Sequence, residues 1–149
     1  MSCVLRFTLN VPVRFRAYID GAARGNPGPA GAGVHIESQD GRPVEELYAA
    51  LGKATNNVAE YSALLLALAR AAELGAETVE ILSDSLLLVQ QVKGVFKVKA
   101  PHLVPLVSDA VRRAKGFRRF SIRHVPREKN TLADRLANLG ADESERARS

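Results

Sequence analysis

The sequence has one cysteine, Cys3, among its 149 residues, so an internal disulfide is excluded. Disulfides are rare in reducing compartments, and we therefore expect a cytoplasmic protein. No stretch is apolar and long enough to cross a bilayer, so no membrane partner is predicted. The apolar stretch near the start lies between Arg6 and Arg14 and is not followed by a small-residue cleavage site, which argues against a secretory signal peptide.

Repeats and low-complexity segments are also absent, and the composition is that of one globular domain. Of the residues 46% are hydrophobic and 25% are charged, and there are seven prolines, which argues against disorder. The formal net charge of +5 suits a polyanionic partner such as nucleic acid. Charge alone does not establish that partner, because small basic domains carry excess charge for other reasons.

The domain is expected at residues 13–142. Residues 1–12 show no clear period and are interpreted as an N-terminal extension or edge segment. Residues 143–149 are charged and lack large apolar side chains, and we expect a flexible tail there.

Three strands are predicted in the first third of the domain. Apolar and polar residues alternate from Phe15 to Asp20, the period of a strand with two different faces. A glycine- and proline-rich turn follows, and further strands are expected at residues 31–38 and 43–51. Short turns between consecutive strands favour an antiparallel meander.

Helices and strands alternate in the rest of the domain. Helices that end at or near glycines are expected at 58–74, 85–93 and 101–115, strands at 78–82 and 120–125, and a closing helix at 131–139. The order predicts an α/β fold, with a five-stranded mixed sheet flanked by helices. In such sheets ligands bind beyond the carboxyl ends of the parallel strands, near the point where strand order reverses.

Four of the sixteen acidic residues occupy unusual positions. Asp20 and Asp84 follow the ends of apolar strands, and Glu60 and Asp134 are expected in the first turns of two helices, on their inner sides. Each is also compatible with an ordinary turn or helix-capping role, since carboxylates near a helix N-terminus are favoured by its dipole. Together, however, the four are predicted to point to one edge of the sheet.

Four carboxylates in contact repel one another and require cations to relieve the repulsion. Because no histidine or cysteine accompanies them, the ligands are all oxygens, which favours Mg²⁺ or Mn²⁺ over zinc. Two such ions about 4 Å apart can activate a water and stabilise the leaving oxygen in phosphodiester cleavage.

From about Arg14 to Asp142 the sequence resembles the type 1 ribonuclease H family. The resemblance rests on the segments YIDGAARGNPGPAGAG, ATNNVAEYSALLLAL, ILSDSLLLV and HVPREKNTLAD, in that order. It implies a ribonuclease H-like fold and an endoribonuclease that hydrolyses the RNA strand of RNA–DNA hybrids with two metal ions. The implied products carry 5′-phosphate and 3′-hydroxyl ends.

The resemblance also implies a role for each acidic residue. Asp20 is similar to the carboxylate that bridges both metals. Asp134 corresponds to a ligand of the metal that activates the attacking water. Glu60 and Asp84 correspond to ligands of the metal near the leaving 3′ oxygen.

Hybrid-binding residues are implied in the same way. Asn26 and Asn57, with Asn56 beside them, match residues that contact the minor groove, and Thr55 matches a residue that binds a DNA phosphate. For Thr55 and Asn56 a helix N-cap role remains open as well. Contacts with ribose 2′-hydroxyls, which distinguish RNA from DNA, are implied for Ser85 and for the backbone around Gly21 and Ala23.

The sequence departs from many family members in the connection after the last predicted strand. A Gly-His-rich loop is replaced by PREKN, and His124 precedes this connection, so we assign His124 no catalytic role. Arg127 is the candidate to substitute, by contacting the scissile phosphate, and the alternative is a plain surface arginine. His35 and His102 are expected on strand and helix surfaces.

The segment GVFKVKAPH is shorter than the basic protrusion of some relatives. The segment contains Phe96, Lys97 and Lys99, and Lys93 directly precedes it. We therefore predict that hybrid binding is weaker than in those relatives and depends only modestly on salt. Leu86 stands where relatives often have a polar minor-groove contact, which predicts a slight shift in the discrimination between RNA and DNA.

Three other hypotheses remain. One is a non-catalytic nucleic-acid-binding domain on the same fold, which is disfavoured because such domains usually lose one or more of the acids. Another is a domain released from a reverse transcriptase polyprotein, and the third is a structural protein without a reaction. We predict a monomer with an RNA–DNA hybrid as its partner.

Overall fold

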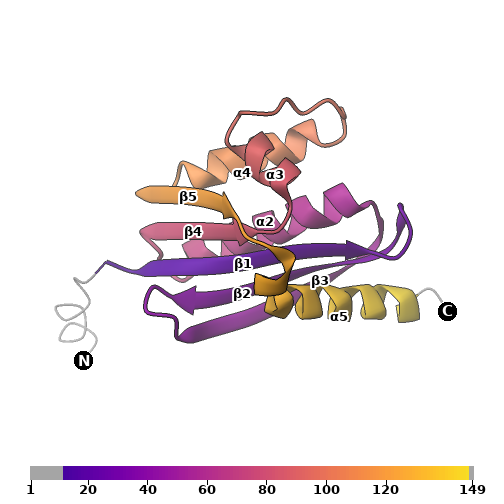
Figure 1. Cartoon of the computed structure of the whole chain (residues 1–149), viewed down its shortest axis with the longest axis horizontal. Coiled ribbons are helices and arrows are strands. Elements are labelled where there is room, and N and C mark those ends of the chain that lie inside the picture. The colour runs from indigo at the N-terminus through magenta and orange to yellow at the C-terminus, as the bar shows by residue number, and fades with distance from the viewer. Residues whose placement is uncertain (1–11, 148–149) are drawn as a thin grey trace.

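The computed structural model describes residues 12–147, whose five strands form one mixed sheet (Figure 1). The order across the sheet is β3-β2-β1-β4-β5. Antiparallel pairing joins β1 to β2 and β2 to β3, whereas β4 pairs in parallel with β1 and β5. The predicted five-stranded mixed sheet with an N-terminal meander is therefore confirmed. The strand bounds are β1 Arg14–Ala23, β2 Gly28–Ser38, β3 Pro43–Ala54, β4 Thr78–Ser83 and β5 Arg119–His124.

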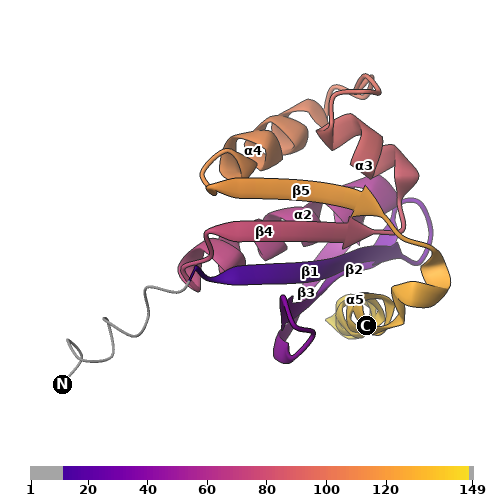
Figure 2. The same cartoon turned by 60° about the vertical axis from the view of Figure 1, so that its left-hand side comes forward.

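Helices cover both faces of this sheet. Their bounds are α2 Asn56–Glu73, α3 Leu86–Val92, α4 Val104–Ala114 and α5 Thr131–Ala147, with a short 3-10 helix η1 at Arg127–Lys129. In Figure 2 the chain leaves the arrowhead of β5, passes the ends of the strands and enters α5 on the side of the sheet opposite to α2. No helix within residues 12–147 has both the length and the apolar character needed to cross a membrane.

The two-residue period of β2 divides its side chains between two faces. Val34 and Ile36 belong to the main buried cluster, together with Leu64 and Leu68 of α2. The alternate positions include Gly31 and Gly33, both of which lie against the backbone of α5. A methyl group on Gly33 would stand 2.4 Å from the Ala133 carbonyl oxygen, so only glycine allows α5 to lie this close to the strand.

Helix α5 is longer than the sequence predicted. We expected it to end at residue 139 and residues 143–149 to form a flexible tail, but the helix continues to Ala147. Its last turns are held by Ser144, which is 2% exposed, donates to the Ala30 carbonyl at 2.7 Å and accepts from the Gly52 N–H. The tail prediction is therefore wrong for 143–147, because a small polar residue made a buried contact that composition does not reveal.

His35 is buried, contrary to the surface position predicted for it. It lies on the α5 side of β2, with its two ring nitrogens 3.4 Å from Glu37 and 3.3 Å from Glu46. His102 is exposed, as predicted, but it precedes α4, which begins at Val104 and not at residue 101. The extension predicted at residues 1–12 lies, apart from Pro12, outside the described residues.

Candidate metal-dependent active site

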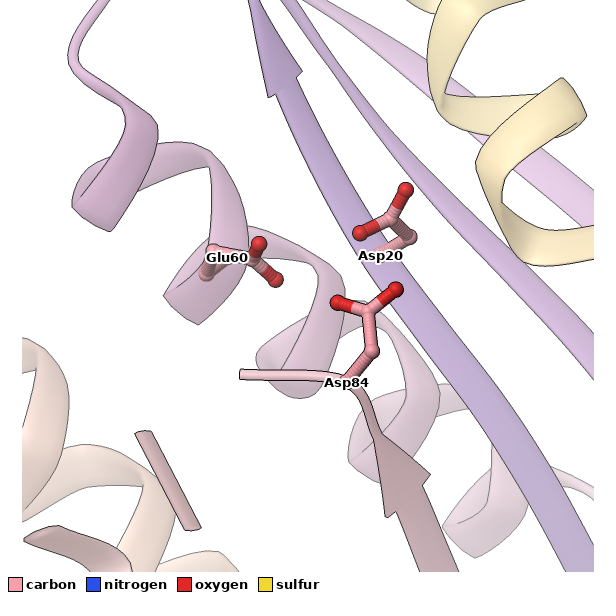
Figure 3. Close-up of side chains that lie close together, drawn as sticks. All are labelled: Asp20, Glu60 and Asp84. Carbon is pink, nitrogen blue, oxygen red and sulfur yellow. The ribbon is translucent and has the colours of Figure 1, made fainter. Parts of the chain in front are cut away.

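Three carboxyl groups from three different elements converge at the carboxyl end of the parallel strands. Asp20 lies on β1, Glu60 on α2 and Asp84 directly after β4, and each offers an oxygen within 4.8 Å of the others. Figure 3 shows the three side chains pointing toward one another. The predicted convergence of these three residues is therefore present in the structure.

Strand register accounts for two of the three. In the parallel pair β1–β4, Ile19 lies opposite Ser83, so the next residues along the two strands are Asp20 and Asp84. Parallel pairing in register places these two residues side by side, although only β4 ends here and β1 continues to Ala23, beyond the strand end that the sequence predicted at Asp20. Asp20 is 6% exposed, because it lies within the sheet rather than beyond it.

Gly21 brings the third carboxyl group into place. Its Cα faces α2, and a methyl group there would lie 2.3 Å from the backbone carbon of Ala59 and 2.4 Å from the nitrogen of Glu60. The backbone N–H of Gly21 also lies near enough to the Glu60 carboxylate to favour its charged form. The sequence predicted Glu60 in the first turn of this helix. It is instead the fifth residue of α2, because the helix begins at Asn56, two residues before the predicted start.

Asp134 reaches the same site from the other face of the sheet. It lies in the first turn of α5, and its carboxyl group is close enough to that of Asp20 to help raise the pKa of Asp20. The side chain is exposed, unlike that of Asp20. Asn138, one turn further along α5, donates to Asp134 through its side-chain amide, at 2.9 Å to the carbonyl and 3.4 Å to the carboxylate. All four acids predicted from the sequence therefore border one site.

Burial and mutual repulsion make two of these groups unusually weak acids. Burial raises the pKa of Asp20 to about 9, and the charges of Glu60 and Asp84 and the contact with Asp134 add to the shift. Burial and the Asp84 charge raise the pKa of Glu60 to about 8, against the opposing effects of the Gly21 N–H and the Arg127 guanidinium. Without a cation the cluster therefore retains protons at neutral pH.

The donor set fits a hard divalent cation. All the ligand atoms are carboxylate oxygens, and Oε2 of Glu60 is buried without a hydrogen-bond partner among the described residues. Buried polar atoms are normally satisfied, so an unmatched carboxylate oxygen beside two further carboxylates indicates a cation-binding role.

A cleft of about 440 Å³ lies over this cluster. Its lining includes the four acids and five of the seven residues predicted to bind the hybrid, namely Gly21, Ala23, Asn56, Asn57 and Ser85. The lining is mostly polar, and it joins residues that are more than a hundred positions apart in the sequence.

The two other predicted hybrid-binding residues, Thr55 and Asn26, stand beside the cleft and hold the start of α2. Thr55 is its N-cap and accepts from the Val58 N–H at 3.2 Å, so the capping alternative is confirmed for Thr55. The side-chain oxygen of Asn26 accepts from the Asn56 N–H at 3.0 Å. The sequence also allowed Asp84 to cap the following helix, but Ser85 is the N-cap of α3. The Asp84 carboxylate therefore remains available to the cluster.

Arg127 lines the cleft, whereas His124 is not among its lining residues. The guanidinium of Arg127 lies near enough to Glu60 to oppose the rise in its pKa. Arg127 is also exposed, so both its predicted phosphate contact and the plain surface interpretation stay predictions.

Sequence analysis missed three residues at this site. Ala22 and Asn138 line the cleft, and Asn130 lies behind it with 1% exposure. Asn138 stands four positions after Asp134, the spacing that places two residues on one helix face, and this signal was available. For Asn130 no periodicity pointed inward, because the residue lies in the connection before α5.

The mixed sheet, with one acid on β1, one directly after β4 and a third on α2, has the arrangement of a ribonuclease H-like domain. A protein-family model described as reverse transcriptase-like matches residues 18–140. The chain is 33% identical over 143 residues to a ribonuclease H of Methylococcus capsulatus, covering 85% of this chain and 88% of that protein. The chain belongs to the ribonuclease H-like family.

More similar relatives are longer proteins. The bifunctional protein Rv2228c of Mycobacterium tuberculosis is 48% identical over 124 residues, and the match covers 83% of this chain but only 34% of that protein. The chain thus spans about a third of the length of that curated relative. A ribonuclease HI of Halobacterium salinarum is 44% identical over 131 residues, covering 88% of this chain and 66% of that protein.

Solved structures agree with the fold. The N-terminal RNase H domain of the Mycobacterium tuberculosis protein superposes with a TM-score of 0.88 at 43% identity, covering 92% of this chain and 99% of that one. LC11-RNase H1, whose structure is in complex with an RNA/DNA hybrid, gives a TM-score of 0.83 at 40% identity over 88% of this chain and 99% of that one.

Proposed function

We propose that the chain is an endoribonuclease that hydrolyses the RNA strand of RNA–DNA hybrids, leaving 5′-phosphate and 3′-hydroxyl ends. The observation that carries the proposal is the convergence of Asp20, Glu60 and Asp84, bordered by Asp134, at the floor of a polar cleft. Relatives named ribonuclease H or HI, and the hybrid bound to LC11-RNase H1, support the choice of substrate.

The four acids are proposed to hold two ions of Mg²⁺ or Mn²⁺. Such a pair, when bound, activates a water and stabilises charge on the phosphate and the leaving oxygen. Asp20 neighbours the other three and is proposed to bridge both ions. Asp134 is proposed to hold the ion on the side of the attacking water, and Glu60 and Asp84 the ion beside the leaving 3′ oxygen.

Arg127 is proposed to contact the scissile phosphate. Its guanidinium stays charged at any working pH and can donate two parallel hydrogen bonds to phosphate oxygens, so its contribution is electrostatic and not that of a base. Its location at the cleft beside Glu60 supports this role.

Recognition of the hybrid is proposed to use the rim of the cleft. Because the side-chain oxygen of Asn26 is engaged by Asn56, its amide N–H groups remain to donate, and base edges in the minor groove offer acceptors. Asn57 and Ser85 line the cleft, where a ribose 2′-hydroxyl can meet a side-chain oxygen. Thr55 is proposed to add a phosphate contact to its capping role.

The segment after α3 is proposed to grip the DNA strand weakly. Lys93, Lys97, Lys99 and Phe96 are all exposed there. Few phosphate contacts release few counterions, so hybrid affinity is expected to fall only modestly as salt is raised. A monomer in the cytoplasm remains a prediction from the sequence.

The proposal is tested with strand-labelled hybrid, duplex DNA and duplex RNA of one sequence, each incubated with Mg²⁺, Mn²⁺ or a chelator. We expect metal-dependent cleavage confined to the RNA strand of the hybrid, with products that a 5′-phosphate-dependent exonuclease degrades. Cleavage in the chelator, or cutting of the DNA strand, would contradict it. Tight hybrid binding without cleavage under every condition would instead favour a non-catalytic binding domain.

A further inference from the structure

Asn130 is a buried polar residue that contacts three of the four acid-bearing segments. It lies between η1 and α5, and it is 1% exposed. Its side-chain amide donates to the Ile19 carbonyl at 2.8 Å and, more weakly, to Oδ2 of Asp84 at 3.4 Å. Its own carbonyl accepts from the Asp134 N–H at 3.1 Å.

These contacts connect segments that are far apart in the sequence. Ile19 directly precedes Asp20 on β1, so the bond to its carbonyl fixes the backbone that carries the most buried acid. The same amide group reaches the Asp84 carboxylate after β4. The backbone carbonyl of Asn130 accepts the first hydrogen bond of α5, from the N–H of Asp134 itself. Asn130 thus contacts β1, the residue that directly follows the neighbouring strand β4, and α5, the helix that lies on one face of the sheet.

Helix capping alone does not explain this arrangement. Asparagine is favoured at helix starts because its side-chain oxygen accepts from an N–H of the first turn. Here the recorded side-chain bonds go to β1 and Asp84, and Oδ1 is buried without a partner among the described residues. A buried amide with one unmatched end calls for a further explanation.

We propose that Asn130 is a positioning residue that sets the spacing of Asp20, Asp84 and Asp134 for cation binding. The inference rests on the proposed metal-dependent function. Groups that hydrogen-bond to metal ligands fix the orientation of those ligands, and their removal typically lowers metal affinity or activity by about 10–100-fold. Asn130 does not touch the substrate in this account.

The test compares Asn130→Ala and Asn130→Ser with the matched control Ser144→Ala in the full chain. Ser144 is also buried on α5 and also donates to a strand carbonyl, at 2.7 Å to Ala30, but it lies ten residues, or about 15 Å, from Asp134 along the helix. Asn130→Ser keeps a residue favoured at helix starts, so it separates the helix start from the amide contacts.

Three quantities are measured: the melting temperature in chelator, the Mn²⁺ affinity by calorimetry without nucleic acid, and kcat and KM for hybrid cleavage. All three variants are expected to melt at lower temperature than the wild type in chelator. Only the Asn130 variants are expected to lose Mn²⁺ affinity, by about tenfold or more. Their kcat is expected to fall at fixed Mn²⁺ and to recover as Mn²⁺ is raised, with the KM for the hybrid unchanged.

Wild-type Mn²⁺ affinity in an Asn130 variant would overturn the inference, as would an equal loss in Ser144→Ala. If Asn130→Ala fails to fold, Asn130→Ser decides by the same criterion. A wild-type protein that binds Mn²⁺ but leaves hybrid intact would overturn the proposed function, while the comparison of Mn²⁺ affinities would still decide the role of Asn130. A wild-type protein without Mn²⁺ affinity would overturn both.

Discussion

Gly21 and Ala59 lie so close that a methyl group on Gly21 would stand 2.3 Å from the backbone carbon of Ala59. Contact at this distance is possible only for glycine, and it brings helix α2 against β1 one residue after Asp20. The Glu60 nitrogen is equally close, at 2.4 Å from the same position. The approach of Glu60 to Asp20 therefore depends on a missing side chain.

Gly21→Ala is expected to displace α2 and separate Glu60 from Asp20. The free energy of unfolding should fall by about 1–3 kcal/mol, as for other overpacked sites, and Mn²⁺ affinity should fall with it. Gly75→Ala is the control, since Gly75 has open space around it and a φ of +79 that disfavours alanine. It should lose about 1 kcal/mol and keep wild-type Mn²⁺ affinity. Unchanged affinity in Gly21→Ala would show that the close approach does not matter for the site.

Metal-free protein is expected to lose stability as pH rises. Folding raises the pKa of Asp20 from 3.8 to about 9 and that of Glu60 from 4.5 to about 8. The folded state thus binds these protons more tightly than the unfolded state. The resulting stabilisation is fully present below the unfolded pKa values and is lost as pH rises through the folded ones.

Urea unfolding in chelator between pH 5 and pH 9 measures this loss. The range begins just above the ordinary carboxyl pKa of about 4 and extends through the raised values of the folded state. Added Mg²⁺ should offset it most at high pH, because cations and protons compete for the same oxygens. Glu60→Gln removes one titrating group and should flatten the chelator profile. A wild-type profile that does not fall with pH would refute the assignment of these shifts.

Arg127→Ala is expected to slow hybrid cleavage without altering the fold. Losing a charge-assisted contact to the phosphate should reduce kcat by about tenfold, corresponding to about 1.4 kcal/mol. The melting temperature should not change, since Arg127 is exposed. His124→Ala is the control, because His124 is exposed nearby in the sequence but does not line the cleft, and this variant should retain wild-type kcat. Equal kinetics for Arg127→Ala and the wild type would return Arg127 to the class of surface arginines.

Much of this site could be predicted from the sequence, because the apolar pattern around each acid indicates the strand or helix that carries it. Asp20 and Asp84 each come directly after an apolar segment of the sequence, and the parallel pairing of β1 with β4 places the two residues side by side. The helix bearing Glu60 was visible from its apolar positions, although its start at Asn56 was placed two residues too late. The helix bearing Asp134 was equally visible at its start but not at its end.

The features that could not be predicted depend on single long-range contacts. Ser144 extends α5 by bonding to β2 and β3, and His35 is buried between two glutamates on neighbouring strands. Asn130 bonds to a carbonyl 111 positions earlier in the chain. Such polar contacts leave no period in the sequence, because only the packing of α5 against the sheet decides which polar residues become buried.

The most direct test of the account is hybrid cleavage by Asp84→Asn beside the wild type. The substitution is nearly isosteric, and it removes a charge that raises the pKa of both Asp20 and Glu60, so the metal-free variant should fold at least as stably. With Mg²⁺ or Mn²⁺ its kcat should fall by about a hundredfold or more. Near-normal cleavage by the folded variant would contradict the claim that these carboxylates hold the catalytic cations.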